Sequence, residues 1–232
     1  MLGGKPCQDQ VAFFQNGSCV CLALCDGAGS YDDSQIAARI AVDQLSRYFA
    51  ASFDEIFPLP AEDISSLIFM HADAISENYQ ISLNCTLLLA AMNEDGRCIT
   101  AHIGDGYILS ADDCGKREIL SHPDNGEEEN ITWFLSSYDR MDRLRIQKST
   151  YTAGTSIFLC SDGAGCSLVE KTHLTVAKAI TTISHWMQQY DGDSVSSQLQ
   201  IELEEAFRLH SKDDMSLAVL TLLNEESCLY RD

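Results

Sequence analysis

Three apolar runs with the composition of β-strands each meet an aspartate at one end, and this arrangement constrains the fold more than any other feature. The junctions are Val20 to Cys25 before Asp26-Gly27, Ser156 to Cys160 before Ser161-Asp162-Gly163, and Asp213-Asp214 before Met215 to Leu223. Side chains of a strand alternate between two faces, so an aspartate at its end can leave the apolar stack and point beyond the sheet edge. The sequence therefore predicts carboxylates that converge in a cleft.

The residue types at these junctions favour a metal site. Gly27 and Gly163 follow their aspartates directly, and glycine lets a metal or phosphate approach the backbone, which makes the Gly27 carbonyl a candidate ligand. Mg²⁺ and Mn²⁺ select carboxylate, carbonyl and water oxygens. A single Asp-Gly pair is typical of ordinary turns, so the metal hypothesis depends on finding three such junctions in one chain.

Length and composition favour one core. The chain has 232 residues and 45% hydrophobic content, which is enough for one sizeable core, and neither a linker nor a fixed-period repeat divides it. We therefore predict a single domain over residues 1–232.

The charge balance excludes several partners. A formal net charge of −20 disfavours nucleic acid, because phosphate backbones are held by clustered Lys and Arg. An acidic surface also repels anionic lipid headgroups. The sequence shows no signal-peptide pattern and no apolar stretch long enough for a bilayer, so we expect no membrane partner and a cytoplasmic location.

The ten cysteines fall mainly in apolar, strand-like runs. Without a secretory signal this usage favours free buried thiols over disulfides. Cys19 and Cys21 alternate with Val20 and Leu22 as core residues of a strand do, and no matching Cys or His pair follows at zinc spacing. We therefore predict a structural role for them.

Periodicity predicts helices near both ends and strands between them. Helices are expected over residues 34–50, 61–79, 172–189 and 194–210. Strands are expected near 10–14, 18–25, 84–92, 98–103, 106–110, 118–120, 132–136, 145–150, 156–160 and 215–223. This order indicates an α+β fold of two stacked antiparallel sheets flanked by helix pairs. The polar segment 122–147 is the expected flap over the cleft, where substrate selection is predicted.

The ordered motifs resemble those of the metal-dependent protein phosphatases of type 2C, in particular a compact bacterial branch. The matching segments run from about Gly4 to Leu223 in the expected order. They are Gly4 to Asp9, Cys25 to Ser30, Cys85 to Leu88, Ile103 to Gly106, Asn130 to Leu135, Ser161 to Gly163 and Lys212 to Ser216. The resemblance implies a four-layer αββα sandwich.

The resemblance also implies hydrolysis of phosphoserine and phosphothreonine with two Mn²⁺ or Mg²⁺ ions. Asp26 would bridge the ions, the Gly27 carbonyl would bind one, and Asp162 and Asp213 would bind the other, so Asp26, Asp162 and Asp213 are the predicted catalytic residues. A hydroxide held between the ions would attack phosphorus directly. The expected partner is a phosphorylated protein, with a cognate serine/threonine kinase and a signalling role, and the expected state is a monomer.

Two more carboxylates belong to the predicted metal set. Asp9 is a candidate ligand or supporting carboxylate, and Asp105 is a candidate for a third ion. The alternatives are that Asp105 caps its turn and that Asp9 caps a strand. Asp214 is a weaker candidate than Asp213, because the next residue of a strand points to the other face.

Several positions depart from the family pattern. Gln8 stands where many members have glutamate, and Gly4 stands where a phosphate-binding arginine is expected, which leaves Lys5 as the candidate phosphate contact. Ala28 replaces a histidine acid of some members, and Cys166 replaces an aspartate common at the third metal site. Two alternatives therefore stay open: a catalytically weak relative that binds phosphoproteins or regulates, and a phosphatase for small phosphate esters.

Overall fold

The computed structural model describes residues 7–31, 33–124 and 132–224, and it contains two larger antiparallel sheets. The first is five-stranded, in the order β1 (Asp9–Asn16), β2 (Cys19–Asp26), β3 (Leu87–Asn93), β4 (Arg97–Ile103) and β7 (Arg145–Thr150). The second is four-stranded, in the order β11 (Leu217–Thr221), β8 (Ser156–Cys160), β5 (Tyr107–Ala111) and β6 (Arg117–Ser121). Strands from both ends of the described chain share this sandwich.

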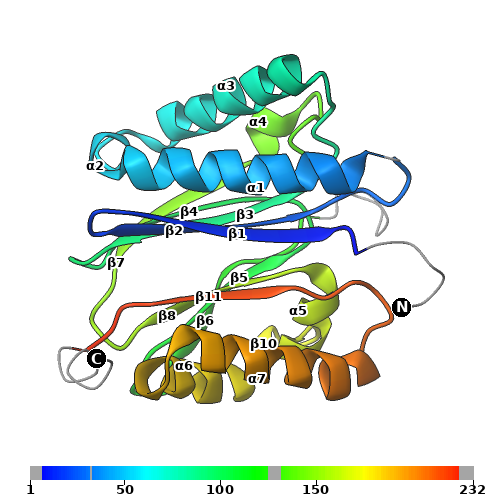
Figure 1. The fold of residues 1–232 in the computed structure, drawn as a ribbon. Helices are drawn as coiled ribbons and strands as arrows, with labels where there is room; N and C mark the ends of the chain where they lie inside the picture. Colours follow the sequence, from blue (N-terminus) through cyan, green and yellow to red (C-terminus); the bar gives the residue numbers. More distant parts are fainter. Residues whose placement is uncertain (1–6, 32, 125–131, 225–232) are drawn as a thin grey trace.

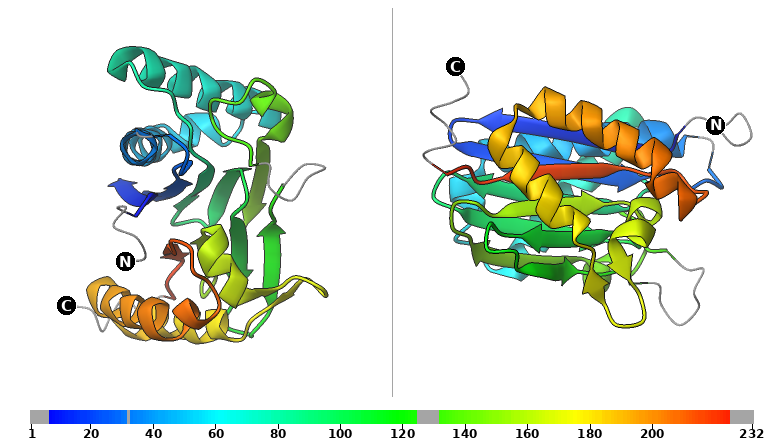
Figure 2. Two further views of the ribbon diagram at one scale, coloured as in Figure 1. Left: turned by 90° about the vertical axis from the view of Figure 1, so that its right-hand side faces the viewer. Right: turned by 90° about the horizontal axis from the view of Figure 1, so that it is seen from below.

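Helices cover the outer face of each sheet (Figure 1). Helices α1 (Ser34–Ala51) and α3 (Ala61–Tyr79) lie over the first sheet, and α6 (Ala179–Gln189) and α7 (Gly192–Glu205) lie over the second. The two further views in Figure 2 show the same succession of layers. The predicted four-layer αββα sandwich is confirmed.

Short elements connect these layers. They are α2 (Phe53–Ile56), α4 (Arg140–Arg143), α5 (Asp162–Leu168), the paired strands β9 (Val169–Glu170) and β10 (Thr175–Val176), and the 3₁₀ turn η1 (Phe207–Leu209). None of the helices in the described ranges combines the length and the hydrophobicity that a membrane crossing requires.

Alternation along β2 shows how the sequence builds two core layers at once. Cys21, Ala23 and Cys25 pack toward α1 and α3, whereas Leu22 and Leu24 pack toward the second sheet. A third apolar layer lies between the second sheet and its helices. The cysteines that the structure describes are all free, and most are buried, which agrees with the predicted structural role.

The predicted strand 132–136 is wrong, because its described residues form a loop and a turn. Its backbone groups bond outside any ladder: the N–H of Phe134 donates to Ser137 Oγ, and the N–H of Leu135 donates to the Cys85 carbonyl. Leu135 is fully buried in the core under α1 and α3. The segment therefore contributes an apolar side chain to the core from a loop. Its strand-like composition does not distinguish such a buried loop from a strand.

The predicted helix 172–189 begins only at Ala179. Before it, β9 and β10 form a small hairpin, and the Glu170 carboxylate accepts the N–H groups of Thr172 and His173. These hydrogen bonds between the Glu170 side chain and the backbone compete with helix formation. The predicted helix 194–210 likewise stops at Glu205 and continues as η1.

The predicted flap 122–147 is divided among different structures. Residues 125–131 lie outside the described residues. Of the remainder, Arg140–Arg143 forms α4 and the last residues belong to β7, inside the first sheet. Only part of this segment reaches the cleft, at Thr132 and Phe134.

The strand ends decide where functional side chains gather. In the β1–β2 ladder Asp9 is paired with Asp26, and in the second sheet Cys160 is paired with Leu217. The turn from β4 to β5 contains Gly104, Asp105 and Gly106. Junctions of both sheets therefore meet at one end of the sandwich.

Candidate metal centre

A cleft of about 600 Å³ opens at this end of the sandwich. Four predicted carboxylates line it: Asp26, Asp105, Asp162 and Asp213. The other lining residues are Gln8, Gly27, Ala28, Gly29, Ser30, Thr86, Thr132, Phe134 and Asp214. Among these described residues there is no lysine, arginine or histidine, so the cleft concentrates negative charge without a side-chain counter-charge.

Asp9 lies at the start of β1 and is only 5% exposed. Both of its carboxylate oxygens lack a hydrogen-bond partner within normal geometry. Burial raises the pKa of Asp9 to about 6, and the charge of Asp214 adds to this, while the nearby Ser161 and Ser216 hydroxyls act in the opposite direction. A buried carboxylate with two free oxygens is costly unless a cation or donor completes it, so this residue fits a metal.

Asp26 ends β2 and is held through its backbone. Its N–H donates to Thr86 Oγ1 at 2.9 Å, and its carbonyl accepts the Thr86 N–H at 2.9 Å. Burial raises the pKa of the Asp26 carboxyl to about 9, with the charges of Asp9, Asp162 and Asp105 adding to the effect. Backbone hydrogen bonds thus hold the Asp26 carboxyl among other acids. A divalent cation would offset the repulsion between their negative charges.

Asp162 follows β8, which ends at Cys160 as predicted, and it is the first residue of α5 after Ser161. Burial raises its pKa to about 7, followed by the charges of Asp105 and Asp213, whereas the Gly163 N–H, which donates to its Oδ1 at 2.6 Å, favours the charged form. Ser161 holds this junction to the last strand, because its N–H donates to the Ser216 carbonyl at 3.0 Å and its Oγ accepts the Ser216 N–H at 2.9 Å.

Gly27 has no room for a side chain. A Cβ there would lie 2.8 Å from the carbonyl of Ser34, at the start of α1, so only glycine permits this close approach. Its N–H donates to the Gln8 carbonyl at 3.2 Å. The role of the Gly27 carbonyl as a ligand stays a prediction.

Two departures from the family pattern now have a structural context. Gln8 donates from Nε2 to Ser34 Oγ at 3.1 Å, so its amide is joined to the start of α1. Cys166 is exposed on α5. Lys5 and Gly4 lie outside the described residues, and the predicted phosphate contact of Lys5 stays a prediction.

The sequence reasoning missed some residues of the cleft. Thr132 donates from Oγ1 to Asp105 Oδ2 at 2.7 Å, and Thr86 supports Asp26. The reason for ranking Asp214 below Asp213 as a ligand does not hold, because β11 begins only at Leu217 and strand alternation therefore does not apply to residues 213–214. The ranking itself stays a prediction. Both aspartates line the cleft. Thr86 belongs to the segment Cys85 to Leu88, which resembles a family motif, and this resemblance could have pointed to it.

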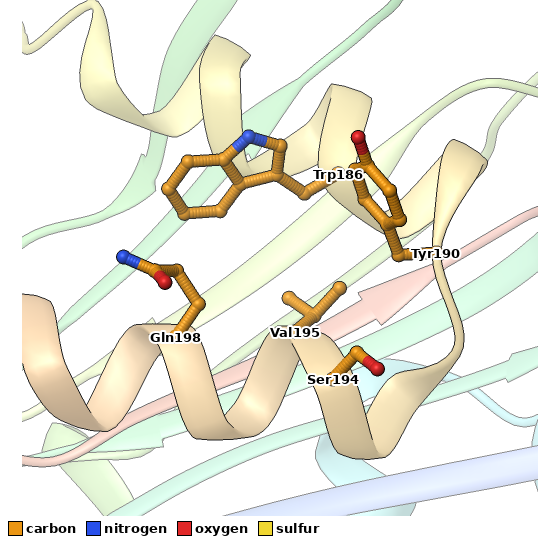
Figure 3. A pocket seen from close by; sticks show the side chains of 5 residues that line it. All are labelled: Trp186, Tyr190, Ser194, Val195 and Gln198. Atoms are coloured by element: carbon orange, nitrogen blue, oxygen red, sulfur yellow. The ribbon is translucent and has the colours of Figure 1, made fainter.

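Two other sites differ chemically from this cleft. A cavity of about 300 Å³ lies between α6 and α7 and is lined by Trp186, Tyr190, Ser194, Val195 and Gln198 (Figure 3). None of these five described lining residues carries a carboxylate. On the turn after β5, Asp112, Asp113 and Cys114 bring potential ligand atoms within 4.8 Å of one another, although exposed acids often gather without an ion. No three acids among the described cleft residues bring potential ligand atoms that close together.

Two stacked antiparallel sheets with a carboxylate-lined cleft at one end fit a metal-dependent protein phosphatase, and the sequence profile assigns the class. The chain belongs to the family described as Protein phosphatase 2C, whose sequence profile matches residues 2–204. No curated protein is significantly similar to the whole sequence.

Solved structures share the fold at low sequence identity. A serine/threonine phosphatase of S. agalactiae is 19% identical, with a TM-score of 0.64 and 94% of each chain covered. The catalytic domain of the serine/threonine protein phosphatase PstP, in complex with two manganese ions, is 18% identical, with a TM-score of 0.58 and coverage of 96% of this chain and 94% of that one. A C. elegans sex determining protein is 15% identical, with a TM-score of 0.67 and coverage of 94% and 62%, respectively.

Proposed function

We propose that this protein is a Mn²⁺- or Mg²⁺-dependent phosphatase that hydrolyses phosphoserine and phosphothreonine in proteins. The observation that carries the proposal is the buried Asp9 carboxylate, which is paired across the ladder with Asp26. The Ser161 and Ser216 hydroxyls lie near it, but neither oxygen has a hydrogen-bond partner of normal geometry. Membership in the Protein phosphatase 2C family supports the same chemistry.

The carboxylates of the cleft fit a pair of divalent cations. Asp26 is assigned as the bridging ligand, with the Gly27 carbonyl on one ion and with Asp162 and Asp213 on the other. Asp9 does not line the cleft but is paired with Asp26 across the ladder. It is assigned to the same centre because its two oxygens lack a hydrogen-bond partner of normal geometry and could accept from a cation-bound water or bind a cation. All of these donors are hard oxygens, the type that Mn²⁺ and Mg²⁺ prefer.

Asp105 is the candidate ligand for a third ion. It lines the cleft and one of its oxygens already accepts the Thr132 hydroxyl. Cys166 stands where a further aspartate is common in the family, so this third site is expected to be weak.

Bound divalent cations would supply electrostatic stabilisation of the phosphoryl group and a water activated for in-line attack. The chain's own residues orient this centre. Burial raises the pKa of Asp9, Asp26 and Asp162, so the charged form of these carboxyls would be favoured by the bound cations and not by the chain itself. Burial, with the charges of Asp9 and Asp214 adding to it, raises the pKa of the nearby Cys7 thiol to about 11, so Cys7 stays protonated at neutral pH and is a poor nucleophile. Ala28 offers no proton, so a general acid from this position is not part of the proposal.

The surroundings of the cleft support a phosphoprotein substrate. Ser30, which is exposed, and Phe134, which is half-buried, line the cleft, and we infer that they leave room for a phosphorylated residue carried on a protein surface. We assign Lys5 as a phosphate contact, a cognate kinase as the source of the substrate, the cytoplasm as the location and a monomer as the working state; these assignments rest on the sequence.

The deciding experiment measures hydrolysis of p-nitrophenyl phosphate and of a phosphothreonine peptide with Mn²⁺, Mg²⁺ or a chelator. Asp162→Ala is compared with Asp193→Ala, which changes an exposed aspartate of α7. We expect metal-dependent turnover that is lost in the first variant and kept in the second. Turnover of Asp162→Ala equal to that of the unmodified protein would contradict the site assignment.

The same assay separates the alternatives. Metal binding and phosphopeptide binding without turnover would favour a catalytically weak, phosphoprotein-binding relative, for which Gln8 and Cys166 are the motivating departures. Turnover of small esters without turnover of phosphopeptides would favour a small-ester phosphatase.

A further inference from the structure

Asp214 forms a contact between distant parts of the chain. Its Oδ2 accepts the backbone N–H of Gln8 at 2.9 Å, across a sequence separation of 206 residues. The contact joins the loop before β11 to the residue before β1. A hydrogen bond to an ionised acceptor is stronger than a neutral one, so this contact is a firm anchor for the first described residues.

Gln8 connects Asp214 to the candidate metal ligands through further contacts. Its carbonyl accepts the Gly27 N–H at 3.2 Å, and its side chain donates to Ser34 Oγ at 3.1 Å. The next residue is Asp9, which is paired with Asp26. A shift of Gln8 would therefore displace the Asp9 carboxylate and the Gly27 backbone together.

The backbone around Asp214 is itself firmly placed. A Cβ on Gly163 would lie only 2.1 Å from the Asp214 carbonyl oxygen, so the two loops are in close contact. Ser216 makes two backbone-mediated hydrogen bonds with Ser161. Because these contacts do not involve the Asp214 side chain, its carboxylate extends from a fixed support toward Gln8.

We propose that Asp214 is a positioning residue of the candidate metal centre: it holds the Gln8 N–H and thereby sets the positions of Asp9 and Gly27. This inference rests on the proposed function, because the centre that it organises is the proposed metal site. It gives Asp214 a role different from that of Asp213, its neighbour in the cleft, which is assigned as a ligand.

Asp214→Ala and Asp214→Asn form the matched test. Asparagine keeps an oxygen acceptor for the Gln8 N–H and removes the charge, whereas alanine removes both. The first measurement is amide hydrogen exchange of Gln8 by NMR in metal-free protein. We expect Asp214→Ala to accelerate this exchange at least about tenfold, the loss of one protecting hydrogen bond, and Asp214→Asn to preserve most of the protection.

The second measurement is Mn²⁺ affinity by titration calorimetry. Loss of a residue that orients ligands typically weakens metal binding by about 10- to 100-fold, and we expect this for Asp214→Ala. Asp214→Asn is expected to stay within about threefold of the unmodified protein, as is the distant control Asp193→Ala. A melting curve of each metal-free variant confirms that it is folded.

Three outcomes would overturn the inference. The first is an unchanged rate of Gln8 amide exchange in Asp214→Ala, and the second is an unchanged Mn²⁺ affinity in that variant. The third is an equal loss of Mn²⁺ affinity in Asp214→Asn and Asp214→Ala, which would mean that the charge of Asp214 matters and that Asp214 is a direct ligand. If the unmodified protein binds no Mn²⁺, the proposed function fails. The exchange measurement then still decides whether Asp214 positions Gln8.

Discussion

The two ends of strands β8 and β11 hold buried polar groups in opposite states. At one end, Ser156 is fully buried and its hydroxyl lies 2.7 Å from Ser184 Oγ and 2.8 Å from Thr221 Oγ1. At the other end, Asp9 lies near Ser161 and Ser216, yet both of its carboxylate oxygens lack partners of normal geometry.

The difference separates groups that stabilise the fold from groups that are kept for chemistry. Satisfied hydroxyls at a buried strand end contribute modestly to stability and fix the packing. Unpaired, mutually repelling carboxylates cost stability, and such groups concentrate at functional sites. Four substitutions test this contrast, from the largest expected effect to the smallest.

Asp26→Ala should abolish metal-dependent hydrolysis, with a fall in kcat/KM of at least about a thousandfold, an effect of at least about 4 kcal/mol. The variant removes the proposed bridging ligand without removing core volume, so circular dichroism should show an intact fold. Hydrolysis of p-nitrophenyl phosphate with Mn²⁺ is the measurement. Residual activity above a tenth of the original would remove Asp26 from the centre of the mechanism.

Asp26→Asn should raise the melting temperature of the metal-free protein by several degrees at pH 8. The pKa of Asp26 is raised from 3.8 to about 9 in the folded state, so between these values the unfolded chain binds fewer protons and stability falls as pH rises. The amide has no such titration. The difference in melting temperature between Asp26→Asn and the unmodified protein should therefore be smaller at pH 5 than at pH 8.

Saturating Mn²⁺ provides the internal control for that comparison. At 100 times its dissociation constant, a bound ion stabilises by about 2.7 kcal/mol, and the unmodified protein should regain stability while Asp26→Asn should not. A variant that melts below the unmodified metal-free protein at pH 8 would show that the acidic cluster is not destabilising.

Ser156→Ala should lower the free energy of unfolding by about 1–3 kcal/mol, because it leaves the buried hydroxyl of Ser184 and the half-buried hydroxyl of Thr221 without their shared partner. Urea unfolding measures the effect. Activity with Mn²⁺ should remain within twofold, since Ser156 lies at the far end of β8. Exposed Ser197 of α7 is the matched control, and its alanine variant should change neither quantity. A large loss of activity in Ser156→Ala would contradict the separation between the two ends.

Thr132→Val should lower kcat/KM by about fivefold, equivalent to about 1 kcal/mol for one hydrogen bond. The change removes the hydroxyl that donates to Asp105 Oδ2 at 2.7 Å. Thr182→Val on the exposed side of α6 is the control. If the two variants behave alike at all Mn²⁺ concentrations, the Thr132 contact does not tune Asp105.

Sequence patterns found the parts of the fold that local alternation governs. Strand β2 and helix α1 lie close to their predicted ranges, because their apolar residues follow one period without interruption. The expected strand 132–136 and helix 172–189 failed where other groups took over the backbone. Ser137 and Cys85 accept N–H groups of the first segment, and Glu170 closes the turn before the second helix.

The candidate site divides in the same way. The aspartates next to strand ends were visible as local signals, and the ordered motifs indicated the family. The role proposed for Asp214 was not visible, since the strand was expected to begin at Met215 and alternation was applied to a residue that lies in a loop. Thr132 was assigned to a strand and therefore was not expected beside Asp105.

The sequence by itself determined the apolar strands, the acids at their ends and the excess of negative charge, because these depend on residue type and short-range spacing. Only the tertiary structure decided that Asp9 is buried with neither oxygen in a hydrogen bond of normal geometry, and that the Gln8 N–H meets the Asp214 carboxylate from 206 residues away. This burial and this long-range hydrogen bond arise because strand ends of both sheets lie at the same end of the sandwich. No local segment of the sequence contains that information, because the meeting residues are far apart in the chain.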